Sequence, residues 1–476
     1  MRRFGRFSKV ARGRTLLAAL CVSALVFAAC GGDDDDDDGG ETTETTAPAD
    51  DGGDDTGGEL TDSFRGVTAG AIKLGIVLVD YSAIADFVDF ERGDQERTFQ
   101  VLIDWINSEG GVGGRMIEPV FLEYPPIPGM EPSPLAICTQ LTEDEEVFAI
   151  LGVFIDFTGD GQLCVSRDHD TIHIGHELQQ AWIDEADPGL LLTPGGVPEG
   201  TVERLLLLLD QEGTLEGRTV AVLGDDDAES RINDVIVPGL EELGVDMGST
   251  GILTITGTDT AAAQGQLDGI IERWKEEGVD TIFMAGLTAS AKQFVEKIGA
   301  EIPDVLFIVD SGSVAQQAQD LEAAGTTPNP YVGMLTVEGQ SRFDRWDAPN
   351  ETLQACVDAY EEATGETVLP PEEAEVSPEG KTIEIYVAVE DACDELLMFK
   401  QIAEKAGANL TNDTWVEAVH SFGPIAIATS NIASLCEGKY TANDEYGLVE
   451  FDPSIGENGD WAPVTELVDT SEGRCG

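Results

Sequence analysis

Six side chains that could hold a small solute follow short apolar stretches of the sequence, at the positions where buried strands would end. They are two aromatic residues, three carboxylates and a histidine: Tyr81, Phe154, Asp156, His176, Asp225 and Asp310. In open α/β sheets, ligands bind beyond the carboxyl ends of the strands. Aromatic rings would provide an apolar wall, and a carboxylate would pair with an ammonium group. We expect these six residues to line a binding site, although a solvated loop or a helix cap explains any single one at least as well.

Metal and enzyme signatures are absent from the sequence. His169, His173 and His176 lie close together, but a continuous strand would point His173 and His176 to opposite faces, and no C-x-x-C or helical H-x-x-x-H pair is present. The sequence also lacks a G-x-S-x-G elbow, a Walker loop, an H-E-x-x-H motif and a G-x-G-x-x-G turn after a strand. We therefore expect no metal, no cofactor and no enzyme activity.

The net charge excludes two kinds of partner. The chain has 92 acidic and 26 basic residues, which gives a formal charge of −66. Residues 31–62 hold fourteen of the acids and no base, yet the body at residues 63–476 still has 78 acids and 20 bases. Such a body repels nucleic acid and anionic lipid headgroups. A solvated acidic surface explains the composition, and adaptation to a salty medium would produce the same one.

The first 62 residues indicate export and attachment to a membrane. Six Arg and Lys residues within the first fourteen positions precede an uncharged, largely apolar stretch at residues 15–29, as in a secretory signal peptide. The stretch ends Leu25-Val26-Phe27-Ala28-Ala29-Cys30, which resembles a bacterial lipobox and implies that the Cys30 sulfur carries a lipid. Residues 31–62 are rich in Gly, Asp and Thr and predict an extended, disordered spacer. An ordinary signal peptide with an incidental cysteine is the alternative.

The cysteines of the body predict disulfides. Besides Cys21 in the signal peptide and Cys30, the sequence contains six: Cys138, Cys164, Cys356, Cys393, Cys436 and Cys475. An even number in an exported chain favours disulfides, although six cysteines permit fifteen pairings. Because loop-closure entropy favours near neighbours, we expect the pairs 138–164, 356–393 and 436–475.

Hydrophobic periodicity predicts two successive runs of alternating strands and helices. In the first run, residues 72–79, 117–123 and 147–151 are predicted strands, and residues 99–106 predict a helix that Gly110 and Gly111 end. After Pro194 the pattern begins again, with strands predicted at 219–223, 249–256, 281–284 and 305–309. This alternation predicts an α/β fold with two Rossmann-like lobes on parallel sheets. Residues 345–425 are predicted to be mostly helical and to complete the first lobe; a separate helical domain is the alternative.

Several motifs, taken in order over about residues 66–435, resemble those of one family. They are Gly66-Val67-Thr68 before Ile72-Lys73-Leu74-Gly75, Ile106-Asn107 before the turn at residues 110–115, Cys138 with Glu143-Asp144, the strand at residues 147–152, Cys164, and the strands at residues 218–223 and 279–283. This combination resembles the type I periplasmic binding proteins, in particular the branched-chain amino acid (leucine-binding type) receptors of ABC importers.

The resemblance implies a ligand cleft between two lobes, a multi-crossing hinge that closes on a small solute, and an ABC permease as the membrane partner. It also implies that Cys164 pairs with Cys138. Leucine-type receptors usually hold the ligand carboxylate with Ser or Thr after the third and fourth strands, where this sequence has residues 153–156 and Gly175-His176-Glu177. A cationic, neutral or amide-like solute is therefore as compatible with the sequence as an amino acid.

These observations predict an organisation and a function. The predicted segments are a signal peptide (1–29), a lipidated cysteine and acidic linker (30–62), a first part of lobe 1 (63–192), a first part of lobe 2 (193–336), a helical return to lobe 1 (337–425) and a last part of lobe 2 (426–476). We expect a monomeric, lipid-anchored, extracytoplasmic solute-binding protein of an ABC importer, with no nucleic-acid partner. A receptor that senses a solute and signals to a membrane partner without transport is the alternative, and a purely structural envelope protein would bind no solute.

Overall fold

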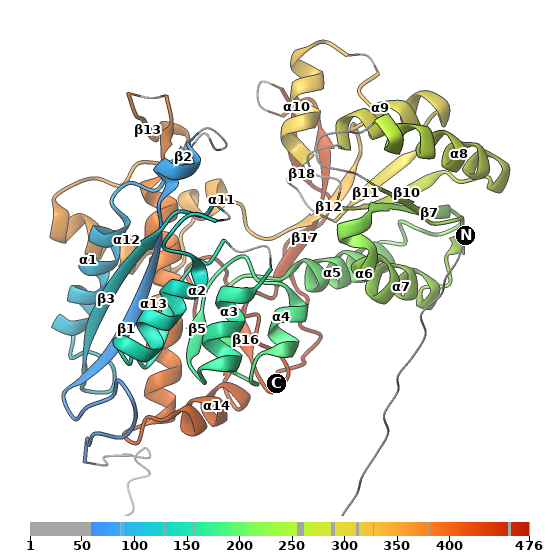
Figure 1. Ribbon diagram of the computed structural model, residues 1–476. Coiled ribbons are helices and arrows are strands. Elements are labelled where there is room, and N and C mark those ends of the chain that lie inside the picture. Colours follow the sequence, from blue (N-terminus) through green and yellow to red (C-terminus); the bar gives the residue numbers. More distant parts are fainter. Residues whose placement is uncertain are drawn as a thin grey trace, which may run out of the picture. The chain divides into compact units, whose positions relative to one another are not determined.

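The computed structural model describes residues 59–475 apart from 86–87, 89, 128, 156–157, 255–260, 287–290, 311–313, 327, 379 and 456–457. The predicted signal peptide, Cys30 and almost all of the predicted linker therefore lie outside the described residues. The described part has the predicted α/β fold, with a central sheet of parallel strands in each of two lobes (Figure 1). Within it, every helix is too short or too polar to cross a bilayer.

The first lobe contains a parallel five-stranded sheet in the order β3-β1-β4-β5-β6. Its strands are β1 (Ala71–Val79), β3 (Met116–Tyr124), β4 (Ala149–Gly152), β5 (Ile172–Ile174) and β6 (Leu191–Leu192). Side chains of β1 alternate between two cores, since Leu74 and Ile76 pack on one face and Val77 and Val79 on the other. A strand covered on both faces explains the continuous apolar run in the sequence.

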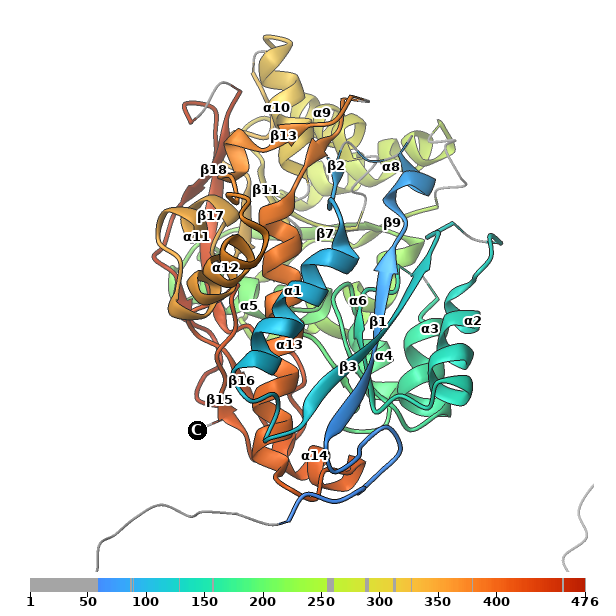
Figure 2. The same cartoon turned by 90° about the vertical axis from the view of Figure 1, so that its left-hand side faces the viewer.

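Helices from distant parts of the sequence cover the two faces of this sheet (Figures 1 and 2). One face packs against α1 (Gln95–Ser108), α12 (Glu351–Thr364), α13 (Ile385–Ala406) and α14 (Asn412–His420). The other packs against α2 (Pro134–Thr139), the π-helical turns η2 (Gln140–Asp144) and η3 (Cys164–Asp168), α3 (Asp160–Leu163) and α4 (Gln180–Glu185). Side chains from residues 351–420 thus belong to the core of the first lobe.

The second lobe contains a mixed sheet in the order β18-β17-β12-β11-β10-β7-β8. Its parallel part consists of β7 (Thr219–Asp225), β8 (Asp246–Met247), β9 (Gly251–Leu253), β10 (Thr281–Ala285), β11 (Leu306–Val309) and β12 (Leu335–Glu338). Three antiparallel strands extend one edge: β17 (Glu445–Asp452), β18 (Asp460–Pro463) and β19 (Val468–Asp469). The prediction of parallel strands did not include this antiparallel edge.

The helices of the second lobe also form two layers (Figure 1). On one face lie α8 (Ala261–Glu277), α9 (Ala291–Glu301) and α10 (Ala315–Ala323). On the other lie α5 (Pro198–Gln211), α6 (Glu229–Arg231), the π-helical turn η5 (Ile232–Ile236) and α7 (Val237–Glu242). Each lobe therefore buries its own sheet between helices.

The chain passes between the lobes three times. It leaves the first lobe after β6, returns between β12 and α11 (Arg342–Asp347), and leaves again before β17. The first and third crossings run together, because the Ala442 amide donates to the Thr193 carbonyl (2.9 Å) and the Asn443 amide to the Pro194 carbonyl (3.0 Å). The second lies beside them, since a Cβ atom built at Gly339 would lie 3.3 Å from Asn443 Nδ2.

Short strands complete the first lobe. A small sheet contains β2 (Phe90–Glu91), β13 (Glu375–Val376) and β14 (Thr382–Ile383), and a hairpin pairs β15 (Gly423–Pro424) with β16 (Ser434–Leu435). Residues Ile427 and Leu435 belong to the core of the first lobe.

Three disulfides are formed, and they are the three pairs that the sequence analysis favoured. Cys138–Cys164 joins α2 to η3, Cys356–Cys393 joins α12 to α13, and Cys436–Cys475 attaches the C-terminal segment beside β16. All three involve first-lobe elements, whereas residues 194–339 contain no cysteine.

Candidate functional site

A cavity of about 860 Å³ lies where strand ends of the two lobes come together. Its lining includes residues that follow β1, β4 and β5 in the first lobe and β10, β11 and β12 in the second. This is the edge at which open α/β sheets bind ligands, and the volume suits a small molecule. A second cavity, of about 460 Å³, is lined mainly by residues 366–387. None of the residues that follow these strands lines it. We call the larger space the cleft.

One wall of the cleft is aromatic. Tyr81 begins a short 3₁₀ turn directly after β1, and its ring lies 5.5 Å from that of Phe90. The Arg92 guanidinium lies over both rings, 4.4 Å from the centre of Phe90 and 5.7 Å from that of Tyr81. Arg92 also forms an ion pair with Glu384. Burial raises the pKa of Tyr81, so its phenol stays neutral near pH 7.

Two glycines allow the ends of β4 and β5 to pack closely beside the cleft. Gly152 ends β4 with φ of 114°, and a Cβ atom there would lie 2.2 Å from the Val77 carbonyl oxygen. A Cβ atom at Gly175 would lie 2.4 Å from the Gly152 oxygen. Only glycine fits both positions, because the backbones of neighbouring strands occupy the space of a side chain. The residues that follow these glycines, Val153 and His176, reach the cleft.

His176 faces two carboxylates of α13. Its Nε2 atom lies 3.7 Å from Glu395 Oε1 and 3.9 Å from Asp391 Oδ1, which is too far for a hydrogen bond. Asp391 lines the cleft, and Glu395 is only 1% exposed. Burial, with the nearby charges of Asp391 and Asp394, raises the pKa of Glu395 well above its usual range.

The opposite wall, in the second lobe, carries a buried ion pair. Arg231, at the end of α6, lies 2.9 Å from Asp310, which directly follows β11. The Gly286 amide donates to the same Asp310 oxygen at 3.0 Å. Burial raises the pKa of Asp310, and the charge of Arg231 and the Gly286 hydrogen bond oppose this. Because Arg231 neutralises Asp310, the pair adds little net charge to the cleft.

A second carboxylate of this wall titrates near neutral pH. Glu338 ends β12 and lines the cleft beside Tyr446. Burial, with a smaller effect of Asp460, raises the pKa of Glu338 to about 7. The charge of the cleft therefore changes between pH 6 and pH 8.

The structure places four of the six predicted residues at the cleft. Tyr81, His176 and Asp310 line it, and so does Phe154, although its ring is fully buried against Tyr124 and His173. Asp225 ends β7 but does not line the cleft, and its side chain accepts a hydrogen bond from the Ala228 amide. Asp156 lies outside the described residues. Contact of any of these residues with a solute stays a prediction.

Sequence reasoning missed four charged residues of the cleft. Arg92, Arg231, Glu338 and Asp391 all line it. Only Glu338 directly ends a strand, one whose position the sequence pattern did not predict. The sequence does hold a signal for the two arginines, because bases are rare in this acidic chain.

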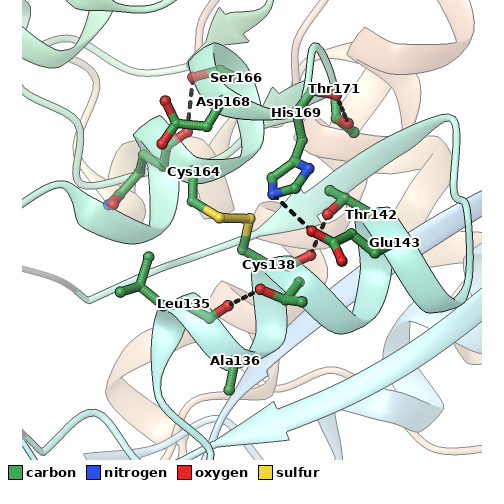
Figure 3. The surroundings of a disulfide bond; sticks show 12 residues. Leu135, Ala136, Cys138, Thr142, Glu143, Cys164, Ser166, Asp168, His169 and Thr171 are labelled. Atoms are coloured by element: carbon green, nitrogen blue, oxygen red, sulfur yellow. Dashed lines mark hydrogen bonds and ion pairs between the residues drawn. A yellow bond between two sulfur atoms is a disulfide. The ribbon is translucent and has the colours of Figure 1, made fainter.

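The histidines do not form a cluster of their own. His173 is fully buried in β5 and its Nε2 bonds the Gly152 carbonyl at 3.1 Å, so burial lowers its pKa to about 4. His169 lies instead beside the Cys138–Cys164 disulfide, where its Nε2 is 3.6 Å from Glu143 (Figure 3). Because the two sulfur atoms are bonded to each other, they do not provide thiolates for a metal ion.

Comparisons with known proteins agree with this architecture. Solved structures that share the fold include an ABC transporter substrate-binding protein from Desulfitobacterium hafniense in complex with Leu (TM-score 0.53, 14% identity, covering 82% of this chain and 100% of that one). Another is a solute binding protein from Rhodopseudomonas palustris BisB5 in complex with 3,4-dihydroxy benzoic acid (TM-score 0.51, 12% identity, 84% and 98%). A third is a fatty acid ABC transporter substrate-binding protein from Thermomonospora curvata (TM-score 0.51, 17% identity, 86% and 95%).

Sequence comparison gives the family. None of the curated proteins matches the chain in sequence. The family model described as periplasmic binding protein, however, matches residues 72–450, which span most of the two lobes. The chain therefore belongs to the periplasmic binding protein family, whose members are binding proteins and not enzymes.

Proposed function

We propose that this chain is the extracytoplasmic solute-binding protein of an ABC importer. The observation that carries the proposal is the cleft of about 860 Å³, which side chains of both lobes line and beside which the three crossings run. A small polar solute, such as an amino acid, an amide or a related compound, binds there, and the lobes close on it by bending at the crossings. The relatives of known structure support the class, since those described above are named as binding leucine, an aromatic acid or a fatty acid.

The N-terminal segment determines the location of the protein in the cell envelope. A signal peptide ending before Cys30 exports the chain, a lipid on Cys30 holds it at the membrane, and residues 31–62 act as a spacer. The closed form then delivers its solute to an ABC permease. A sensory receptor would use the same cleft, and transporter genes beside this one would favour import.

Thermal unfolding of the purified chain against a library of amino acids, amides, amines, polyamines, sugars and carboxylic acids tests the proposal. A solute that binds only the folded state stabilises it by about 2.7 kcal/mol at a hundredfold excess over its dissociation constant, so the melting temperature rises. Small-angle scattering should then show a smaller radius of gyration with the bound solute. A library in which no solute shifts the melting temperature would contradict the proposal.

Two matched variants show whether the cleft is the site. Gly195 lines the cleft, and the nearest atom to a Cβ built there is Thr193 Oγ1 at 3.6 Å, so Gly195→Trp fills the cleft without disturbing the backbone. Gly269 is exposed on α8 with no atom within 4 Å of its Cβ position, so Gly269→Trp is the control. We expect Gly195→Trp to abolish the shift and Gly269→Trp to keep it. Equal shifts in both would place the site elsewhere.

A further inference from the structure

Helix α13 buries three carboxylates, and only two of them have full sets of partners. Arg345 donates two hydrogen bonds to Glu390, at 2.7 and 2.9 Å. Asp394 accepts hydrogen bonds from the Thr429 hydroxyl, at 2.5 Å, and from the Ala428 amide. Glu395 differs, because its Oε2 atom is buried without a hydrogen-bond partner among the described residues. Buried polar atoms in native proteins are nearly always satisfied, so an open carboxylate oxygen indicates a missing partner.

The open oxygen belongs to a side chain that lines a small space beside the cleft. This space, of about 40 Å³, is lined by Glu395, Asp391 and Gln95 among others. It adjoins the cleft, because Tyr81, Arg92, Val153 and Asp391 line both. One water needs about 10–15 Å³, so the space admits a few waters or one small polar group reaching in from the cleft.

The groups around this space favour a hydrogen-bond donor with positive charge. His176 Nε2 is also buried without a hydrogen-bond partner among the described residues, although it faces both Asp391 and Glu395 within 4 Å. Arg92 is engaged by Glu384, and its Nε lies 4.0 Å from Asp391. The rings of Tyr81 and Phe90 already bind one cation, because the Arg92 guanidinium lies over their faces.

The net charge of the cleft points the same way. Its lining contains two arginines and four carboxylates, Glu177, Asp310, Glu338 and Asp391. These six side chains give the lining a formal charge of −2, and Glu395 lies behind it in the adjoining space. A carboxylic acid would have to enter against this charge, whereas an amine would be attracted by it.

We propose that Asp391 and Glu395, with His176, form the subsite for a protonated nitrogen, and that the solute of this protein is a primary amine or amidinium compound. The inference rests on the proposed function, since it assigns a substrate class to the same cleft. It predicts that cationic solutes bind and that carboxylic acids of the same skeleton do not.

Proton release on binding provides an independent readout. Burial raises the pKa of Glu395 well above its usual range, and a cation arriving beside it would lower that pKa again, because the positive charge favours the ionised carboxylate. The charged and titratable groups around Glu395 are Asp391 and Asp394 on the same helix, His176 after β5, Arg92 after β2 and Tyr81 after β1. Glu338 across the cleft would contribute in the same direction.

Isothermal titration calorimetry of the purified chain at pH 7, in buffers of different ionisation enthalpy, tests the inference. The probes are isoamylamine against 4-methylpentanoate, benzylamine against benzoate, and putrescine against succinate. We expect at least one amine to bind at least tenfold more tightly than its acid, with release of protons. Tight binding of any solute without a cationic nitrogen, from these probes or from the thermal library, would overturn the inference and leave the proposed function standing. A chain that binds no solute of any class would overturn both.

Variants of Asp391 and Glu395 test whether these two carboxylates cause the preference for amines. We expect Asp391→Asn and Glu395→Gln each to weaken amine binding at least about tenfold, because each removes the charge of a partly desolvated partner. Glu395→Gln should also abolish most of the proton release, which a merely structural role would not do. The matched control is Glu276→Gln, an exposed carboxylate on α8, which should bind amines as the natural chain does. Thermal unfolding verifies that each variant folds, and unchanged amine affinity in both cleft variants would contradict the assignment.

Discussion

The two lobes share an architecture but are held together by different means. In each, a sheet with a parallel centre lies between two layers of helices. The first lobe is cross-linked, since two disulfides join its own elements and the third attaches the C-terminal segment to it, and α13 alone buries three carboxylates. The second lobe contains no cysteine between residues 194 and 339, and its large buried cores consist of apolar side chains.

This difference separates two ways to stabilise one layered fold. A cross-link acts mainly by restricting the unfolded chain, whereas apolar packing acts through surface removed from water. The polar interior of the first lobe also places groups that change charge with pH close to the cleft. We therefore expect reduction to affect the first lobe and not the second. We expect acid to weaken the first lobe through a buried histidine, whereas the buried carboxylates Asp310 and Glu338 of the second lobe have raised pKa values and bind protons more readily in the folded state.

Removing the disulfide between α12 and α13 should have the largest effect. Cys356 and Cys393 are both buried and are separated by 37 residues. Closing a loop of that length stabilises the folded state by about 4 kcal/mol in the chain-entropy model. We expect Cys356→Ala/Cys393→Ala to lower the protection of first-lobe amides against hydrogen exchange by roughly this free energy, and to leave β7, β10 and β11 protected as before.

The control for this experiment is the pair Cys436→Ala/Cys475→Ala. That disulfide attaches only the C-terminal segment, so its loss should affect residues near the C-terminus and not the first-lobe core. If the Cys356–Cys393 variant lost protection equally in both lobes, the lobes would unfold as one unit and the comparison would fail.

Acid should destabilise the first lobe through His173. Its pKa of about 4 in the folded state lies below the usual 6.5, so the unfolded chain binds the proton first. Stability contributed by neutral His173 is present above pH 6.5 and is lost as the pH falls toward 4, by about 3 kcal/mol in all. Asp394, whose pKa burial raises to about 6, has the opposite slope, because it binds its proton earlier in the folded state.

Comparison with a variant isolates the histidine from such carboxylates. His173→Gln can keep the donor to the Gly152 carbonyl but does not titrate, so denaturant unfolding should show a smaller loss of stability from pH 7 to pH 4.5 than in the natural chain. His169→Gln, at a partly exposed histidine beside the Cys138–Cys164 disulfide, is the control and should follow the natural chain. A pH slope that His173→Gln leaves unchanged would assign the acid sensitivity to other groups.

The fold could be predicted from the sequence because its signals are local. The apolar run at residues 72–79 and the periodic positions at residues 99–106 correspond to β1 and α1. Gly111, predicted to turn the chain, has φ of 74° and no room for a Cβ atom, which would lie 2.0 Å from the Arg115 carbonyl oxygen. Such features depend on residues that are close in sequence, so a pattern shows them.

The cleft could be predicted only in part, because half of it comes from distant segments. Residues directly after a strand, such as Tyr81 and Asp310, follow from the rule that strand ends face the ligand. Asp391 and Glu395 lie in a helix more than 200 residues after β5, whose end they face, and nothing in a helical pattern indicates which carboxylates are buried. The same rule placed Asp225 at the cleft, but it does not say whether a side chain faces the cavity or caps the next turn.

The smallest expected effect concerns how the return helices are attached to the first lobe. Asn350 caps α12 by accepting from the Leu353 amide at 2.9 Å, and its Nδ2 donates to the carbonyls of Ile427, Ala428 and Ser430. We expect Asn350→Ala to lower the free energy of unfolding by about 2 kcal/mol, because it removes a cap and leaves buried carbonyls unpaired. Ser341→Ala removes the cap of α11 and an exposed hydrogen bond to Asp344 within the same turn, and it should cost about 1 kcal/mol. If the two variants lost equal stability in denaturant unfolding, the contacts with residues 427–430 would contribute nothing, and the disulfides would account for the rigidity of the first lobe.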